Sequence, residues 1–153
     1  MQSIGVISDT HGLLRPQALS LLQGSDLIVH AGDIGKPEVI DGLESICPVI
    51  AVRGNVDRAA WADAYPEEQW IDFEGNRIYV IHNLKEMAFE PQSAGANVVI
   101  SGHSHMPKIN NKDGVLYLNP GSAGPRRFKL PVVVARLSLV GSNLIATHHE
   151  LSL

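Results

Sequence analysis

Seven side chains that can bind a metal ion are distributed over five short segments of this chain. They are Asp9 and His11, Asp33, Asn55, His82, and finally His103 and His105. In an extended segment, side chains at positions i and i+2 point the same way, so the first and last pairs can each converge on an ion. Carboxylate, carboxamide and imidazole donors suit Mn, Fe, Zn or Ni, and seven donors fit two ions better than one. The sequence therefore predicts a metal site assembled from distant parts of the chain.

Most of these donors follow a short apolar run that predicts a buried strand. In the first half, strands are predicted over 3–8, 26–31 and 48–53, with helices over 16–22 and 37–46 and a short helix or ordered loop over 58–65. Each of the two longer helices opens at a proline. Alternating strands and helices imply parallel pairing, in which ligands bind beyond the carboxyl ends of the strands. Asp9, Asp33 and Asn55 are thus predicted to meet at one sheet edge.

The second half is predicted to be rich in strands. Runs 69–73 and 77–81 flank a Glu74-Gly75-Asn76 turn, which favours a hairpin that ends at His82. Further strands are expected over 97–100, 108–110, 115–118, 132–139 and 144–150, and one helix, interrupted by Pro91, within 83–94. Two sheets packed face to face, with helices outside, would bring both sets of strand ends to one rim.

The bulk composition predicts one soluble domain over residues 1–153. Hydrophobic residues make up 44% of the 153 residues, enough for a single core. The net charge is −4 and the basic residues are scattered, so nucleic acid is a poor candidate partner. The start of the chain lacks a signal-peptide pattern, Cys47 is the only cysteine, and no apolar run has the length of a membrane span. We therefore expect a cytoplasmic location and no membrane insertion.

In their order along the chain, the five segments resemble the calcineurin-like metallophosphoesterases, in particular the small bacterial and archaeal phosphodiesterases. The family pattern is D-x-H, G-D, G-N-x-D/E, a lone His and G-H-x-H, and the likeness extends from about Ser3 to Ser122. The resemblance implies an α/β fold, a four-layer α-β-β-α sandwich of two mixed sheets. It also implies two divalent metal ions, with Mn²⁺ as the expected ion and Zn²⁺, Fe²⁺ or Ni²⁺ as alternatives.

The resemblance further assigns the donors to two ions that share one carboxylate. The implied sets are Asp9, His11 and His105 for the first ion, Asn55, His82 and His103 for the second, and Asp33 as the bridge. Asp33, Asn55 and His82 are then the expected catalytic residues, and Asn55 is also expected to contact the substrate. A water between two cations becomes hydroxide near neutral pH, so a metal-bound hydroxide is the expected nucleophile toward a phosphodiester bond. The implied substrate is a small or activated phosphoester.

Two positions depart from the family pattern, and a third, which matches it, lacks its usual partner. Val56 stands where many members have a histidine that protonates the leaving oxygen, which favours aryl or other activated phosphodiesters over alkyl monoesters. Asn83 follows His82 where glycine is commoner, so the local turn is in question. The usual partner of Asp57 is the missing histidine, which leaves the role of Asp57 open.

Structural interpretations exist beside the functional ones. Asp9 and Asp33 can be helix caps or loop carboxylates, Asn55 a turn residue, His82 a core histidine, and His103 with His105 a pair of loop imidazoles. His30 is expected to be structural or to support the ligands. Arg126, after a segment that resembles the family's N-P-G-S loop, is either a phosphate-binding residue or a solvated surface arginine.

Two other functions stay open. A protein-binding scaffold resembling the small retromer subunit would have lost metal donors, whereas all seven are present here and only Val56 points that way. A nuclease resembling the recombination nucleases of the family would need a longer chain and a basic surface. The family assembles variously, so a homo-oligomer is also open.

Overall fold

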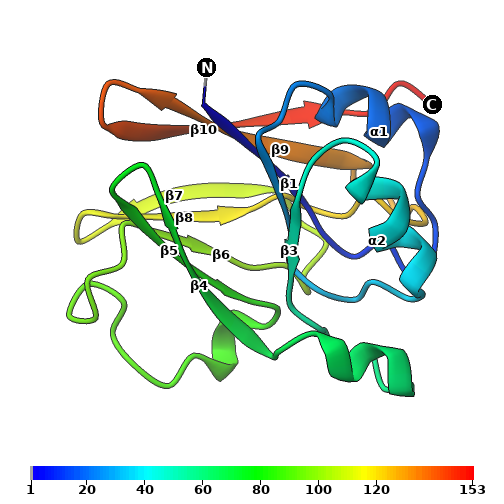
Figure 1. The fold of residues 1–153 in the computed structure, drawn as a ribbon, viewed down its shortest axis with the longest axis horizontal. Helices are drawn as coiled ribbons and strands as arrows, with labels where there is room; N and C mark the ends of the chain where they lie inside the picture. Colours follow the sequence, from blue (N-terminus) through cyan, green and yellow to red (C-terminus); the bar gives the residue numbers. More distant parts are fainter. Residues whose placement is uncertain (1) are drawn as a thin grey trace.

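Two mixed β-sheets lie face to face in the computed structural model, which describes residues 2–153 (Figure 1). The first sheet has the strand order β10-β9-β1-β2-β3. Its strands are β1 (Ser3–Ile7), β2 (Leu27–His30), β3 (Val49–Ala51), β9 (Val133–Val140) and β10 (Asn143–Glu150). The second sheet has the order β4-β5-β6-β8-β7. Its strands are β4 (Glu68–Phe73), β5 (Asn76–Ile81), β6 (Val98–Ile100), β7 (Lys108–Lys112) and β8 (Val115–Asn119).

Parallel strands joined by helical crossovers form the centre of the first sheet. β1 pairs with β2 and β2 with β3 in parallel, through α1 (Pro16–Leu22) and α2 (Pro37–Glu44). Both helices begin at a proline, as the sequence predicts, because the missing N–H costs no hydrogen bond in the first turn. β9 and β10 extend this sheet as an antiparallel hairpin beside β1. The carboxyl ends of β1, β2 and β3 consequently lie at one edge.

The hydrophobic core consists of two main layers. Alternate residues of β1 and β2, such as Val6 and Val29, face the second sheet, where they pack with Val80 and Ile100. The other residues of the same strands, such as Ile7 and Ile28, pack against the two helices. Because both faces of these strands are covered, they read as continuous apolar runs in the sequence.

The segment that covers the outer face of the second sheet differs from the prediction. The helix predicted within 83–94 is wrong: the segment forms only the 3-10 turn η2 (Leu84–Glu86) and then runs irregularly to β6. Pro91 and Gly95 limit a helix here, and Phe89 instead stacks on Trp70 and contacts Tyr79 edge to face, with ring centroids 5.8 and 4.9 Å away. The region predicted as a short helix or ordered loop over 58–65 forms the 3-10 helix η1 (Ala60–Ala64).

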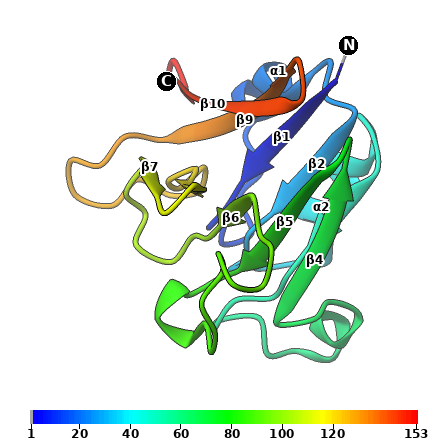
Figure 2. The ribbon, with the colours of Figure 1, turned by 90° about the vertical axis from the view of Figure 1, so that its left-hand side faces the viewer.

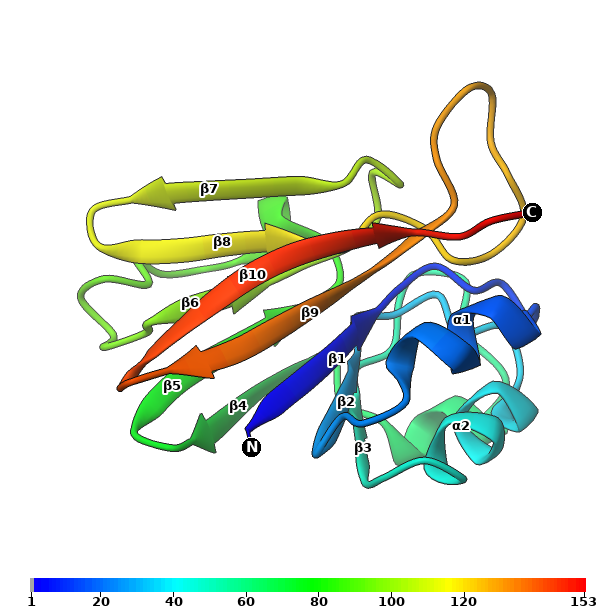
Figure 3. The same cartoon turned by 90° about the horizontal axis from the view of Figure 1, so that it is seen from above.

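These layers make the chain an α/β sandwich of two mixed sheets, as predicted. Seen from above, the strands β1, β8 and β10 point toward the same end of the molecule as the long β8–β9 loop (Figure 3). The view turned by 90° shows the irregular segment after β5 beside the second sheet (Figure 2). Within residues 2–153, no helix is both long and apolar enough to cross a membrane.

Candidate metal centre

Two carboxylates and three imidazoles from both sheets converge at the common rim. Asp9, His11 and His105 offer ligand atoms within 4.8 Å of one another, and so do Asp9, Asp33 and His82. Asp33 Oδ2 lies 3.6 Å from His11 Nε2 and 3.3 Å from His82 Nε2, so one carboxylate oxygen stands between the two groups. Asp9 Oδ1 lies 3.4 Å from His105 Nε2. The five side chains thereby form one continuous cluster of donors.

Several donor atoms in this cluster are buried without a hydrogen-bond partner among the described residues. They are Asp9 Oδ1, His11 Nε2, His82 Nε2 and His105 Nδ1. A buried polar atom left unpaired costs about 1–3 kcal/mol, and such atoms rarely gather by chance. Carboxylate oxygens and imidazole nitrogens that face one another in this way are suited to a divalent transition-metal ion. The residues present therefore fit the ions that the sequence predicts.

Hydrogen bonds on the far side fix the orientation of two donors, His82 and Asp9. His82 Nδ1 lies 2.7 Å from the Ala31 carbonyl oxygen, which can only accept, so Nδ1 carries the proton and Nε2 keeps its lone pair for a cation. Asp9 Oδ2 accepts bonds of 2.6 Å from the Ser8 hydroxyl and 3.1 Å from the His103 N–H, which leaves Oδ1 free. The donors are held ready for an ion by the surrounding backbone.

The backbone at most donors is left-handed. Positive φ angles occur at Asp9, His11, Asp33, His103 and His105, between 47° and 74°. This region is uncommon for residues other than glycine, costs about 1–3 kcal/mol each, and concentrates at functional sites. Sharp turns directly after the strands therefore aim these side chains into one space.

Two glycines permit the close approach of the loops. A methyl group at Gly54 would collide with the Asp33 carboxylate, and one at Gly102 would collide with the Ser8 hydroxyl and reach within 2.7 Å of Asp9 Oδ2. Each glycine directly precedes a predicted donor, Asn55 or His103. The pairing of glycine with a donor in the sequence thus reflects tight packing beside the site.

The ionisable side chains of the cluster shift one another's pKa values. Burial alone raises the pKa of Asp9, but its contacts with His105 and Ser8 and the charge of His82 outweigh burial, so the pKa is lowered. Burial likewise raises the pKa of Asp33, and His82 more than compensates and lowers it. Burial lowers the pKa of His82, yet the two carboxylates and the Ala31 carbonyl raise it overall. Both carboxylates are thus ionised at neutral pH and attract positive charge.

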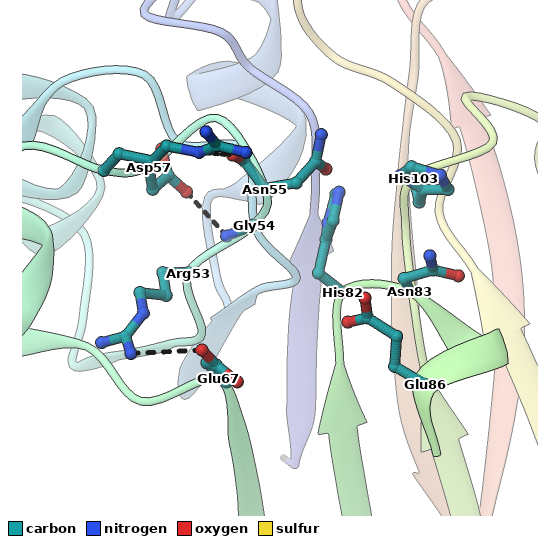
Figure 4. A pocket seen from close by; sticks show the side chains of 10 residues that line it. Arg53, Gly54, Asn55, Asp57, Glu67, His82, Asn83, Glu86 and His103 are labelled. Carbon is teal, nitrogen blue, oxygen red and sulfur yellow. Dashed lines mark hydrogen bonds and ion pairs between the residues drawn. The ribbon is translucent and has the colours of Figure 1, made fainter.

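The remaining two predicted donors line a cleft beside the cluster. Asn55 and His103 are exposed and border a space of about 430 Å³ together with His82. Figure 4 shows Asn55 on one side of the His82 ring and His103 on the other, and the ring centroids of His82 and His103 are 5.3 Å apart. The three residues implied for the second ion therefore share one opening to solvent.

A family model for the calcineurin-like phosphoesterase superfamily domain matches residues 2–142. The chain belongs to this superfamily. A probable metallophosphoesterase of Methanothermobacter thermautotrophicus is 35% identical over 155 residues, which covers 94% of this chain and 89% of that protein. A solved structure described as a novel archaeal phosphodiesterase has a TM-score of 0.78 at 23% identity and covers 97% of this chain and 100% of its own. Chaetomium thermophilum Vps29 has a TM-score of 0.79 at 18% identity, with coverages of 99% and 97%. At these sequence identities, the likeness shows that this chain shares the fold of the two solved structures.

Asp57 of this phosphoesterase domain has a role that the sequence left open. Its buried carboxylate accepts hydrogen bonds from the N–H groups of Gly54, Ile34 and Gly35, at 2.8, 3.0 and 2.9 Å. It thereby fastens the loop of Asn55 to the loop of Asp33. All three bonds come from backbone N–H groups, so Asp57 positions the loops that carry the donors.

His30 of the phosphoesterase domain is also a supporting residue, in agreement with the sequence analysis. Its ring is fully buried, and Nδ1 accepts a 3.1 Å bond from the Gly32 N–H. Nε2 then carries the proton and donates to the Thr10 hydroxyl at 3.0 Å, which in turn donates to the Ile34 carbonyl at 2.8 Å. Burial lowers the pKa of His30 to about 4, so the ring is neutral. The loops that follow β1 and β2 are joined through it.

The other positions of the phosphoesterase pattern are found at the rim. Val56 is 46% exposed, and its N–H donates to Asp33 Oδ1 at 3.2 Å. Asn83 has an ordinary extended backbone, and its side chain accepts a 3.1 Å bond from the Lys85 N–H, so the turn after His82 forms without glycine. Arg126 is exposed on the β8–β9 loop and does not line the cleft of Asn55.

Proposed function

We propose that this chain is a phosphodiesterase that works with two divalent metal ions, for which Mn²⁺ is the expected ion. Asp9, His11 and His105 would hold one ion, Asn55, His82 and His103 would hold the other, and Asp33 would serve both. Membership of the phosphoesterase superfamily supports hydrolase chemistry. The observation that carries the proposal is the position of Asp33 Oδ2 between His11 Nε2 and His82 Nε2. The proposed setting is the cytoplasm, with a small phosphoester as the partner.

When bound, such a pair of ions supplies Lewis-acid activation of water and neutralises charge on the non-bridging phosphate oxygens. The chain's own residues provide the geometry for this. His82 is held by the Ala31 carbonyl, Asp9 by Ser8 and the His103 N–H, and Asp33 by the Val56 N–H. Because these supports are already in place, little reorganisation is needed when a substrate arrives.

The residue that protonates the leaving group in many family members is absent from this chain. Val56 occupies the position of the family's histidine, and the carboxylate of Asp57 is turned to backbone N–H groups. An oxygen that departs without a proton must be a weak base. We therefore propose phosphodiesters with an acidic, for example aryl, leaving group as the preferred class.

The likeness to Vps29 keeps a second candidate, a protein-binding scaffold. A scaffold needs no metal donors, and the unpaired buried atoms of Asp9, His11 and His82 would be a cost without a benefit. A chain that binds no divalent ion at micromolar concentrations would favour the scaffold.

The test is hydrolysis of bis(4-nitrophenyl) phosphate by chelator-treated protein with and without Mn²⁺. We expect no activity without metal, recovery with Mn²⁺, about two ions per chain by elemental analysis, and loss of activity in Asp33→Ala. Asp63→Ala removes an exposed carboxylate outside the cluster and should stay active. Activity that persists both in the chelated protein and in Asp33→Ala would refute the mechanism.

A further inference from the structure

A second, larger hollow adjoins the metal centre along the outer face of the second sheet. It encloses about 810 Å³ and shares Asn83 and His103 with the smaller cleft. One wall is the segment after β5, including Met87 and Phe89, and the floor is the β7–β8 hairpin with Tyr117. We call this hollow the hairpin groove. It begins at a proposed metal ligand and leads away from it.

The groove is open because the irregular segment covers only part of the sheet. Met87 and Phe89 pack with Tyr79 and Val99 of β5 and β6, the strands beneath that segment. Within residues 2–153, no segment covers β8 and β7 in this way: every residue of β7 is exposed, and Tyr117 is half-buried at the boundary. A continuous amphipathic helix would have spanned more of this face. The groove is therefore open because the predicted helix does not form.

The floor of the groove carries a regular pattern of side chains. Lys108, Asn110 and Lys112 alternate along β7, so they share one face and extend over roughly 13 Å. Asn110 lies opposite Tyr117, and Lys108 lies opposite Asn119. Asn119 donates bonds of 2.9 Å to the Gly102 carbonyl and 3.1 Å to the Ser104 hydroxyl. This bonding ties the near end of the hairpin to the loop that carries His103.

The groove combines apolar surface with positive charge. Lys85, Lys108 and Lys112 line it, against the single carboxylate of Glu90. The whole chain has a net charge of −4, so this local excess of lysine runs against the average. Aromatic and thioether side chains suit a flat organic group, and lysines at its edge suit an anion.

We propose that the hairpin groove binds the ester arm that stays on the phosphate, and that this arm carries a flat aromatic group and a second anionic group. This inference rests on the proposed phosphodiesterase function and names its substrate class. The smaller cleft then receives the leaving arm, where Arg58, oriented by a 2.9 Å bond from its Nε to the Asn55 carbonyl, faces the departing oxyanion. In the reaction, water adds to phosphorus and releases a proton to the solvent, the bond to the leaving oxygen breaks with its electron pair staying on that oxygen, and the retained arm remains as a monoester.

Three chromogenic diesters with the same 4-nitrophenolate leaving group separate the contributions. They are methyl 4-nitrophenyl phosphate, thymidine 5′-(4-nitrophenyl phosphate) and its 3′-phosphorylated form. We expect kcat/KM to rise in that order, by about five-fold or more per step, mainly through KM. The double variant Lys108→Gln/Lys112→Gln should remove the gain from the 3′-phosphate. Arg127→Gln/Lys129→Gln, with the same charge change on the exposed β8–β9 loop, should keep that gain and leave the methyl diester within about two-fold.

A binding measurement separates this inference from the proposed function. Calorimetry with thymidine 3′,5′-bisphosphate should show binding that weakens about five-fold or more in the Lys108/Lys112 double variant, and weakens also in Tyr117→Ala. Lysine-dependent binding of the bisphosphate without hydrolysis of any diester would refute the phosphodiesterase function and support the groove as a binding site. Hydrolysis with equal kcat/KM for the three diesters would support the phosphodiesterase function and refute the role of the groove. Self-association of the chain that the lysine variant abolishes, without bisphosphate binding, would assign the groove to a second copy and overturn the inference.

Discussion

The carboxylate of Asp57 accepts a 3.0 Å hydrogen bond from the N–H of Ile34, the residue next to the proposed bridging ligand Asp33. Together with the bonds from Gly35 and Gly54, it joins two loops that follow different strands. The separation between Asp33 and Asn55 thus depends on a residue that binds no metal itself.

Replacement of Asp57 should therefore reduce both stability and metal binding. In Asp57→Asn, an amide group would face backbone donors, and we expect a loss of about 3 kcal/mol in the free energy of unfolding. Urea denaturation of the metal-free protein measures this. Asp63→Asn, an exposed neighbour with the same charge change, should stay within about 0.5 kcal/mol. Equal effects of the two variants would show that Asp57 is not a clamp.

Introduction of a histidine at Val56 should extend the range of substrates. The exposed side chain lies next to Asn55, where an imidazolium could protonate a departing alkoxide. We expect Val56→His to raise kcat for a diester with an aliphatic leaving group by at least about ten-fold, with little change for an aryl diester. Val56→Gln serves as a control because it cannot donate a proton of suitable acidity. No difference between His and Gln at this position would contradict a missing general acid.

His30 should make the protein less stable in mild acid. Burial lowers the pKa of His30 from the ordinary value of 6.5 to about 4. Between pH 6.5 and pH 4, the ring therefore binds a proton in the unfolded chain but not in the folded chain. The stability that His30 contributes is therefore complete above pH 6.5 and falls by about 3 kcal/mol as the pH drops toward 4. His30→Gln does not titrate, so the difference between the two chains in urea unfolding should shrink by that amount. A pH-independent difference would contradict a buried neutral ring.

Metal ions should stabilise the fold through the unpaired donor atoms. An ion that binds only the folded chain adds about 2.7 kcal/mol at one hundred times its dissociation constant, which corresponds to roughly 5–10 °C in the melting temperature. We expect this shift with Mn²⁺ in the wild type and a clearly smaller shift in His105→Gln, which keeps the residues proposed for the second ion. His149→Gln, which removes an imidazole from β10, should keep the shift. An identical shift in both variants would place the ion elsewhere.

Most of the strands and both α-helices could be read from the sequence, and so could the candidate donors, five of which lie together in the structure. Apolar runs that stop at Asp9 and Asp33, prolines that open both helices, and five donor segments in family order depend on local chemistry and spacing. The prediction of a helix within 83–94 was wrong: Phe89 packs against the rings of Trp70 and Tyr79, which lie on β4 and β5 and cannot be seen in the local sequence pattern.

Tertiary structure alone decided how the donors are supported. The sequence shows that Asp57 lies two residues after Asn55. It could not show that the Asp57 carboxylate accepts a hydrogen bond from Ile34, 23 residues earlier in the chain and next to Asp33. The free nitrogen of His82 is set by the Ala31 carbonyl, and the hairpin groove is set by what the segment after β5 leaves uncovered. Local sequence patterns determine which groups are present, whereas hydrogen bonds and packing between distant segments determine which atoms remain free to bind.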